Sequence, residues 1–200
     1  MAHNSKLILA SSSPRRAEIL RNAGFDFEVA PAHIDESRQP DEAAVDYVRR
    51  LAGEKARTIA RQFASRHAAD SAMFIAADTV VVIDNEILGK PSSAANARDM
   101  LYRLSGKTHE VCTGLAVLQG NVAAIGTALE TTRVTFEPLN EKEIEDYIAT
   151  GEPFDKAGAY AIQGQGGKFI SRIEGCYFNV MGLPLARLYA ILRNLKENSQ

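Results

Sequence analysis

The sequence has no excess of positive charge. Its 23 lysines and arginines stand against 25 aspartates and glutamates, which gives a formal net charge of −2. A protein that holds a nucleic-acid backbone through its overall charge needs a broad positive field. The composition therefore argues against nucleic acid as a partner, and any anion-binding site in this chain must be local.

Cysteines are also scarce. Only Cys112 and Cys176 occur, far apart in the sequence and without histidines at the spacing of metal ligands. Disulfide-stapled secreted domains and structural zinc sites both need more of these residues. We therefore expect no disulfide framework and no structural zinc, and a reducing compartment fits best.

Long apolar runs are missing as well. No run approaches the ~20 residues that a membrane-spanning helix requires. Residues 1–6 lack the charged-then-apolar layout of a secretory signal. The expectation is a cytoplasmic protein with no membrane partner.

The chain does have enough apolar residues to form a substantial core. Its 200 residues are 46% apolar and 24% charged, which excludes the disordered and fibrous classes. We find no internal repeat, low-complexity tract or linker in it. A single domain over residues 1–200 is the simplest prediction.

Helical and strand patterns alternate along the sequence. Apolar spacing and capping residues predict helices at 14–23, 41–63, 93–105, 140–150 and 184–195. Apolar and β-branched runs predict strands at 6–10, 25–29, 73–83, 87–88, 109–118 and 122–136. This alternation predicts an α/β fold.

The turn between the first predicted strand and helix could bind phosphate. Ser11, Ser12 and Ser13 precede Pro14, and Arg15 and Arg16 follow it. Backbone N–H groups at a helix start, hydroxyls and two guanidinium groups can converge there on an anion. The alternative interpretation is a plain helix cap followed by surface arginines.

Asp78 interrupts an apolar strand, with residues 73–77 before it and Val80, Val81 and Val82 after it. A buried carboxylate is costly unless it meets a cation, several donors or a metal. Asp78 is therefore a candidate metal ligand or general base. The alternative is that it ends a strand and bonds a neighbouring loop.

Two lysines could neutralise a polyphosphate. Lys55 lies on or beside the apolar stripe of the longest predicted helix, so its ammonium could enter a cleft beside Asp78 or reach water instead. Lys90, between Gly89 and Pro91, could contact phosphate or be an ordinary surface lysine. The other cations of the long helix are interpreted as a solvated face: Arg49, Arg50, Arg57 and Arg61.

Glu36, together with Asp35, could supply a second carboxylate for a divalent cation, although acidic loop residues are mostly just hydrated. Residues 164–168 (GQGGK) do not fit a phosphate-binding loop, because no Ser or Thr follows Lys168 and the first glycine is misplaced. No zinc-protease histidine pair or esterase Gly-x-Ser-x-Gly turn occurs either.

Five short motifs follow one another along nearly the whole chain: residues 9–16 (LASSSPRR), 77–81 (ADTVV), 88–91 (LGKP), 104–109 (LSGKTH) and 179–184 (NVMGLP). In this order they resemble the motif series of the Maf-like nucleotide pyrophosphatases. The resemblance implies hydrolysis of a nucleoside triphosphate between its α- and β-phosphates, with a divalent cation, Mg²⁺ or Mn²⁺. It also implies a two-lobed Maf/ITPase-like fold, in which helices flank a mixed central sheet and the nucleotide cleft lies between the lobes, and a homodimer.

The resemblance also implies a role for each matching residue. It makes Asp78 the proton acceptor and, with Glu36, a metal ligand. It gives catalytic roles to Lys55 and Lys90. The residues implied in substrate binding are Ser11, Arg15, Arg16, Thr79 and Gln163.

Residues 156–164 (KAGAYAIQG) and 173–179 (IEGCYFN) resemble the branch that acts on dTTP and UTP rather than the branch that acts on 7-methyl-GTP. Arg15, Thr79 and Gln163 match positions linked there to substrate choice. A glutamine amide offers one donor and one acceptor to the edge of thymine or uracil, but it can flip to suit cytosine. Ala161 and Cys176 depart from the glycine and serine that are common at these positions.

Three hypotheses follow from the sequence. The first is a pyrophosphatase for dTTP and UTP, with modified pyrimidine nucleotides as further substrates. The second is a 7-methyl-GTP pyrophosphatase. The third is a nucleotide-binding regulator of cell division that uses the same cleft without catalysis.

Overall fold

The computed structural model describes residues 6–64, 72–120 and 124–197 of the 200-residue chain. The predicted start of the last long strand, near Val122, lies outside these residues. The described strands are β1 (Leu7–Leu9), β2 (Phe27–Val29), β3 (Met73–Ile83), β4 (Glu86–Leu88), β5 (Thr108–Gln119), β6 (Ala124–Phe136) and β7 (Ile170–Glu174). The described α-helices are α1 (Pro14–Asn22), α2 (Ala44–Phe63), α3 (Ala94–Leu104), α4 (Glu141–Ala149), α5 (Tyr177–Val180) and α6 (Leu185–Glu197).

These strands form a mixed sheet. Its order is β2-β1-β3-β5-β6-β7, with β4 paired to β3. β1 runs parallel to both β2 and β3, whereas β4 is antiparallel to β3 and β7 is antiparallel to β6. The predicted α/β fold with a mixed sheet and flanking helices is confirmed.

The chain divides into two compact units whose segments interleave in the sequence. The first unit comprises residues 1–78, 113–130 and 182–200, and the second comprises residues 79–112 and 131–181. β3, β5 and β6 each contribute residues to both units. A single domain over residues 1–200, with a nucleotide cleft between lobes, stays a prediction.

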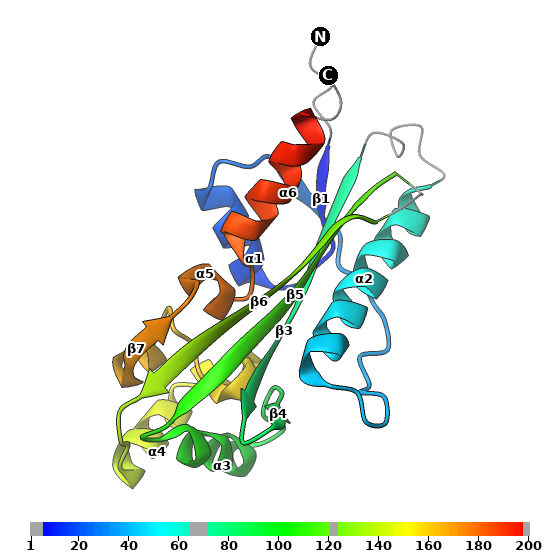
Figure 1. Cartoon of the computed structure of the whole chain (residues 1–200). Coiled ribbons are helices and arrows are strands. Elements are labelled where there is room, and N and C mark those ends of the chain that lie inside the picture. The colour runs from blue at the N-terminus through cyan, green and yellow to red at the C-terminus, as the bar shows by residue number, and fades with distance from the viewer. Residues whose placement is uncertain (1–5, 65–71, 121–123, 198–200) are drawn as a thin grey trace. The chain divides into compact units, whose positions relative to one another are not determined.

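In the first unit, α2 covers one face of the strands, while α1 and α6 lie on the other side (Figure 1). Residues that face α2 form a core with its apolar stripe: Ile8, Ala10, Phe74, Ala76, Ala116 and Leu118 from the strand side, and Ala52, Ala56, Ile59, Ala60 and Phe63 from α2. The helix approaches β5 so closely that a Cβ at Gly114 would overlap the backbone carbonyl of Val48. This packing holds Lys55, on the same helix, against the sheet.

In the second unit, α3 and α4 enclose a core with the strands and with two short 3₁₀ helices, η2 (Ala157–Ala159) and η3 (Gln165–Phe169). A third 3₁₀ helix, η1 (Glu152–Asp155), follows α4. Its aromatic members meet edge to face, as aromatic rings prefer. Phe136 contacts both His109 and Tyr160, and Phe169 contacts Tyr147. The glycine-rich segment from Gly158 to Gly182 contains one described strand, β7.

Two helix starts and one turn are defined by local hydrogen bonds and backbone conformation. Ser93 caps α3 by accepting the N–H of Asn96, and Asn140 and Glu143 form a capping box at the start of α4. Asp84 and Asn85 both have positive φ, of 52° and 63°, in the tight turn between β3 and β4. Such a turn matches the twist of the strands that it joins.

Two helix starts differ from the prediction. Pro14 does open α1, but the Ser13 side chain forms no capping hydrogen bond, and the Ser13 N–H instead donates to Ser11 Oγ at 3.2 Å. The long helix begins at Ala44 rather than Asp41, because Asp41 has a positive φ of 56° and Ala43 is extended, with a ψ of 151°. Among the described helices, none is long and apolar enough to cross a membrane.

Candidate functional site

The turn between β1 and α1 holds a half-buried cation. Arg16 donates from Nη1 to Ser11 Oγ at 3.1 Å and from Nε to the Gly182 carbonyl at 2.7 Å. Burial lowers the pKa of the Arg16 guanidinium, and the nearby Asp78 carboxylate opposes this shift. An arginine remains protonated at neutral pH, so Arg16 offers a fixed positive charge beside the helix start. Arg15 is also partly exposed, and phosphate binding by the two arginines stays a prediction.

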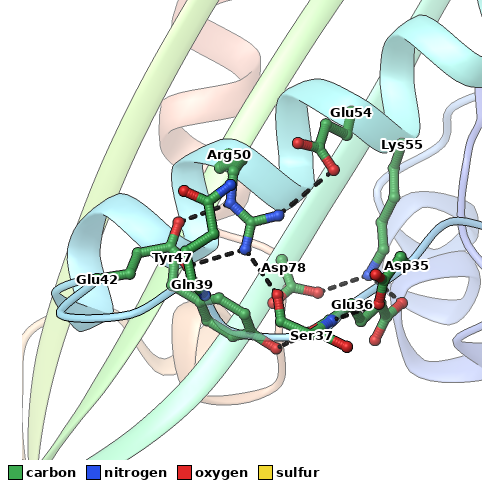
Figure 2. Close-up of polar contacts among 10 residues, drawn as sticks. All are labelled: Asp35, Glu36, Ser37, Gln39, Glu42, Tyr47, Arg50, Glu54, Lys55 and Asp78. Atoms are coloured by element: carbon green, nitrogen blue, oxygen red, sulfur yellow. Dashed lines mark hydrogen bonds and ion pairs between the residues drawn. The ribbon is translucent and has the colours of Figure 1, made fainter.

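Asp78 lies inside the sheet and is paired with the long helix. Its side chain is on β3, where the residue is 8% exposed, and Lys55 of α2 is 7% exposed. Lys55 Nζ donates to Asp78 Oδ1 at 2.6 Å (Figure 2). The sequence prediction that Lys55 points toward Asp78 is confirmed, and the alternative that it reaches water is wrong.

Glu36 joins this pair from the loop before α2. Its Oε1 lies 2.8 Å from Lys55 Nζ, while its side chain is 54% exposed. One ammonium therefore contacts two carboxylates, one from β3 and one from the loop (Figure 2). Arg16 is close enough for both carboxylates to affect the pKa of its guanidinium. Cations and carboxylates that the sequence brings from four segments thus gather in the first unit.

The loop that carries Glu36 is fixed by two side chains of α2. Tyr47 donates its hydroxyl to the Glu36 carbonyl at 2.7 Å, and Arg50 Nη2 donates to the Ser37 carbonyl at 3.0 Å (Figure 2). Arg50 also binds both carboxylate oxygens of Glu42, at 2.6 and 2.8 Å. The contacts of Tyr47 and Arg50 with these two carbonyls fix the backbone that directly follows the Glu36 side chain.

The interpretation of Arg50 as part of a solvated face is wrong. Helical periodicity places Arg50 away from the apolar stripe of α2, and nothing in the sequence indicates that the loop folds back over that side of the helix. The hydrogen bonds between Arg50 and Glu42 raise the pKa of Arg50 and lower the pKa of Glu42 to about 2. Burial raises the pKa of Tyr47, and the negative charges of Asp78 and Glu36 raise it further.

The remaining predicted site residues belong to the second unit. Thr79 follows Asp78 on β3 and is partly exposed. Lys90 is exposed in a segment held by a hydrogen bond from the Gly158 N–H to the Gly89 carbonyl, at 3.0 Å. Gln163 is exposed in the segment between η2 and η3. Their part in the site stays a prediction.

Comparison with known proteins decides the family. The model of a family described as "Maf-like protein" matches residues 6–195. The chain belongs to the Maf-like family. The motif resemblance noted in the sequence is thereby confirmed.

Curated members of the Maf-like family are similar over most of their length. A protein of Citrifermentans bemidjiense named "dTTP/UTP pyrophosphatase" is 49% identical, with 95% of each chain covered. One of the same name from Pasteurella multocida is 46% identical over 92% of this chain and 93% of its own. Among solved structures, the Staphylococcus aureus Ham1 protein matches with a TM-score of 0.52 at 12% identity, covering 98% of this chain and 100% of that one. That likeness concerns the fold alone.

The donor set of this Maf-like chain fits a hard divalent cation. In residues 6–64, 72–120 and 124–197, no three His, Cys, Asp or Glu residues form a cluster that could hold a metal by themselves. Magnesium, however, is usually held by one or two carboxylates together with substrate phosphates and water. Glu36 and Asp78 supply two carboxylates that already converge on one positive charge, the Lys55 ammonium. These residues therefore suit a metal that arrives with a nucleotide.

Proposed function

We propose that this chain is a nucleoside triphosphate pyrophosphatase that hydrolyses dTTP and UTP to the monophosphate and pyrophosphate. The observation that carries the proposal is the contact of the Lys55 ammonium with both Asp78 and Glu36, close to the half-buried Arg16. The names of relatives that are 46–49% identical over more than 90% of both chains support this activity and these substrates.

The first unit supplies the positive charge that phosphoryl transfer needs. Charge develops on the phosphoryl oxygens in the transition state, and positioned cations stabilise it. Arg16, held by Ser11 and the Gly182 carbonyl, cannot swing away from the turn. Arg15, Lys55 and Lys90 are the other cations that we assign to the triphosphate.

Asp78 is the group that we assign to the attacking water. Its carboxylate would accept the water proton while the water oxygen forms the new bond to phosphorus and the bond between the α- and β-phosphates breaks. The pyrophosphate carries away the electron pair of that bond. Lys55, hydrogen-bonded to Asp78 Oδ1, fixes the orientation of the carboxylate.

Glu36 and Asp78 are the residues that would hold the divalent cation, Mg²⁺ or Mn²⁺. When bound, such an ion polarises phosphoryl oxygens and offsets their charge. The carboxylate of Glu36 can move to a metal because its side chain is largely exposed.

Gln163 is the residue that we assign to the nucleobase, together with Arg15 and Thr79. Its amide can donate one hydrogen bond and accept another, which complements the acceptor and N–H on the edge of thymine or uracil. Because the amide can also turn to suit cytosine, a rigid surrounding must fix its orientation.

The test is pyrophosphate release from a panel of nucleoside triphosphates with Mg²⁺ or Mn²⁺. We expect dTTP and UTP to be hydrolysed fastest, and Asp78→Asn to lower kcat by at least about a hundredfold, as loss of a general base does. Preferential hydrolysis of 7-methyl-GTP would contradict the assigned substrates. Equal turnover by wild type and Asp78→Asn, with triphosphate still bound, would instead indicate a regulator that binds nucleotides without hydrolysing them.

A further inference from the structure

The segment that carries Gln163 is anchored from within by two side chains. Tyr147, near the end of α4, is 1% exposed. Its hydroxyl donates to Glu152 Oε1 at 2.7 Å and accepts the N–H of Ala161 at 3.1 Å. A tyrosine that is fully buried with both functions of its hydroxyl engaged has little freedom to move.

Glu152, the first residue of η1, continues the same network. Its Oε2 accepts the N–H of Gln165 at 3.0 Å, and its Oε1 accepts the N–H of Gly166 at 3.1 Å. The Tyr147–Glu152 pair thus accepts hydrogen bonds from three backbone N–H groups, those of Ala161, Gln165 and Gly166. Ala161 lies two residues before Gln163, and the other two lie two and three residues after it.

The charges of the pair suit this role. Burial would by itself raise the pKa of Glu152, but the hydrogen bonds from Tyr147, Gln165 and Gly166 outweigh it, so the pKa lies below its usual value. Burial and the hydrogen bond to Glu152 raise the pKa of Tyr147. At neutral pH the pair is therefore a carboxylate acceptor and a phenol donor, and hydrogen bonds to a charged acceptor are the stronger kind.

Two glycines show how closely the segment fits the pair. A Cβ at Gly164, which has a φ of +153°, would overlap the carboxylate of Glu152. A Cβ at Gly166 would lie 2.6 Å from the Tyr147 hydroxyl oxygen, closer than real Cβ atoms come. Any larger residue at either position would push the segment off its anchors.

We propose that Tyr147 and Glu152 are positioning residues for nucleobase selection, acting through Gln163. The inference rests on the proposed function for the role of Gln163 itself. Gln163 is exposed between anchored neighbours, so the hydrogen bonds of Ala161, Gln165 and Gly166 fix the backbone from which its amide extends. The pair supplies the rigidity that a glutamine needs to distinguish thymine or uracil from cytosine.

The test compares kcat/KM for dTTP with kcat/KM for dCTP in two variants. In Glu152→Gln the new amide nitrogen cannot accept a backbone N–H, and Tyr147→Phe removes the hydroxyl. We expect the dTTP-to-dCTP ratio to fall about three- to tenfold in each variant, mainly through a higher KM for dTTP, since one or two hydrogen bonds are lost. Matched controls are Glu141→Gln, at an exposed position of α4, and Tyr102→Phe, at an exposed position of α3, which should leave the ratio unchanged.

A double-mutant cycle separates positioning from general support of the fold. If Glu152 acts through Gln163, then Glu152→Gln should change the ratio less than about twofold when Gln163 is already alanine, because residues that act together are not additive. An equal fall of the ratio in both backgrounds would overturn the proposal. So would an unchanged ratio in Glu152→Gln and Tyr147→Phe.

Amide hydrogen exchange gives a readout that needs no turnover. In both variants the N–H groups of Ala161, Gln165 and Gly166 should exchange faster than in wild type. The exchange of the amides in α3 and α4 should stay unchanged. Unchanged exchange at these three amides would contradict the proposed anchoring, whatever the catalytic activity of the variants. Faster exchange in a protein that hydrolyses neither dTTP nor UTP would sink the proposed function instead, and with it the link to base selection.

Discussion

Arg50 binds both carboxylate oxygens of Glu42, eight residues before it in the sequence, through Nε and Nη2 at 2.6 and 2.8 Å. The same Nη2 also donates to the carbonyl of Ser37, next to Glu36. Two parallel hydrogen bonds give an arginine–carboxylate pair a defined geometry. Arg50 therefore links the position of Glu36 to the rigid helix α2 rather than leaving it to the loop.

Replacement of Arg50 should weaken the response to metal. In Arg50→Gln the loop loses the hydrogen bonds that Glu42 and the Ser37 carbonyl accept from Arg50, and the Glu36 carboxylate is less well placed for a divalent cation. We expect the Mg²⁺ concentration at half-maximal activity to rise about tenfold, as when residues that orient metal ligands are lost. Titration of pyrophosphate release with Mg²⁺ measures it, and Mn²⁺ binding to the protein, followed by electron paramagnetic resonance, should weaken in parallel.

Arg49 provides the matched control for this prediction. It is the neighbouring arginine on α2 but is exposed, and its nearest described carboxylate, Asp46, lies 4.0 Å away. Arg49→Gln should therefore leave the metal response unchanged. If Arg49→Gln and Arg50→Gln shift the response equally, the effect belongs to the charge of the helix and not to the position of Glu36.

The pair of Lys55 and Asp78 makes a prediction about stability. Lys55→Met leaves the buried carboxylate of Asp78 without its ammonium, which should lower the free energy of unfolding by about 3 kcal/mol. The double variant Lys55→Met with Asp78→Asn should recover part of this loss, because neither member of the pair then leaves the other as an unpaired buried charge. Urea unfolding of the four proteins of the cycle measures the coupling, and simple additivity of the two substitutions would contradict it.

The sequence predicts the site residues that depend on local chemistry better than those that depend on tertiary packing. Asp78 stood out because a carboxylate in an apolar strand must find a partner, and Lys55 was a candidate because of its place beside the apolar stripe of the helix. Arg50 and Tyr47 were not found, because their partners lie in a loop whose path depends on tertiary packing rather than on periodicity. Glu152 was missed for a similar reason: a glutamate in a turn shows no sign of the three donors that the fold brings to it.

The close approach of α2 to β5 requires a glycine at position 114. A Cβ there would overlap the backbone of Val48 and Arg49, and backbone cannot move aside as a flexible side chain can. We expect Gly114→Ala to lower the free energy of unfolding by about 1–3 kcal/mol, the usual cost of overpacking. Thermal or urea unfolding measures this change.

A second glycine provides the comparison. Nothing lies within 4 Å of a Cβ at Gly89, so Gly89→Ala should change stability by no more than about 0.5 kcal/mol. Equal effects of the two substitutions would mean that loss of glycine flexibility, rather than contact with α2, determines the cost at Gly114.

The buried side chain of His109 should make the stability of the fold depend on pH. It is 2% exposed, its Nε2 lies 2.8 Å from the Tyr160 hydroxyl, and its Nδ1 has no hydrogen-bond partner among the described residues. Burial lowers its pKa from 6.5 to about 4. Between these two values the unfolded chain binds a proton that the folded chain does not, so stability is complete above about pH 6.5 and falls as the pH drops toward 4.

The loss should be of the order of 3 kcal/mol, since each pKa unit corresponds to about 1.4 kcal/mol. In His109→Gln, which keeps a polar group beside Tyr160 but cannot titrate, the free energy of unfolding should fall less steeply between pH 6.5 and 4 than in wild type. His33→Gln removes an exposed histidine instead and should keep the wild-type slope. Urea unfolding at a series of pH values measures all three slopes, and the same slope in His109→Gln and wild type would mean that acid destabilises the fold through its carboxylates alone.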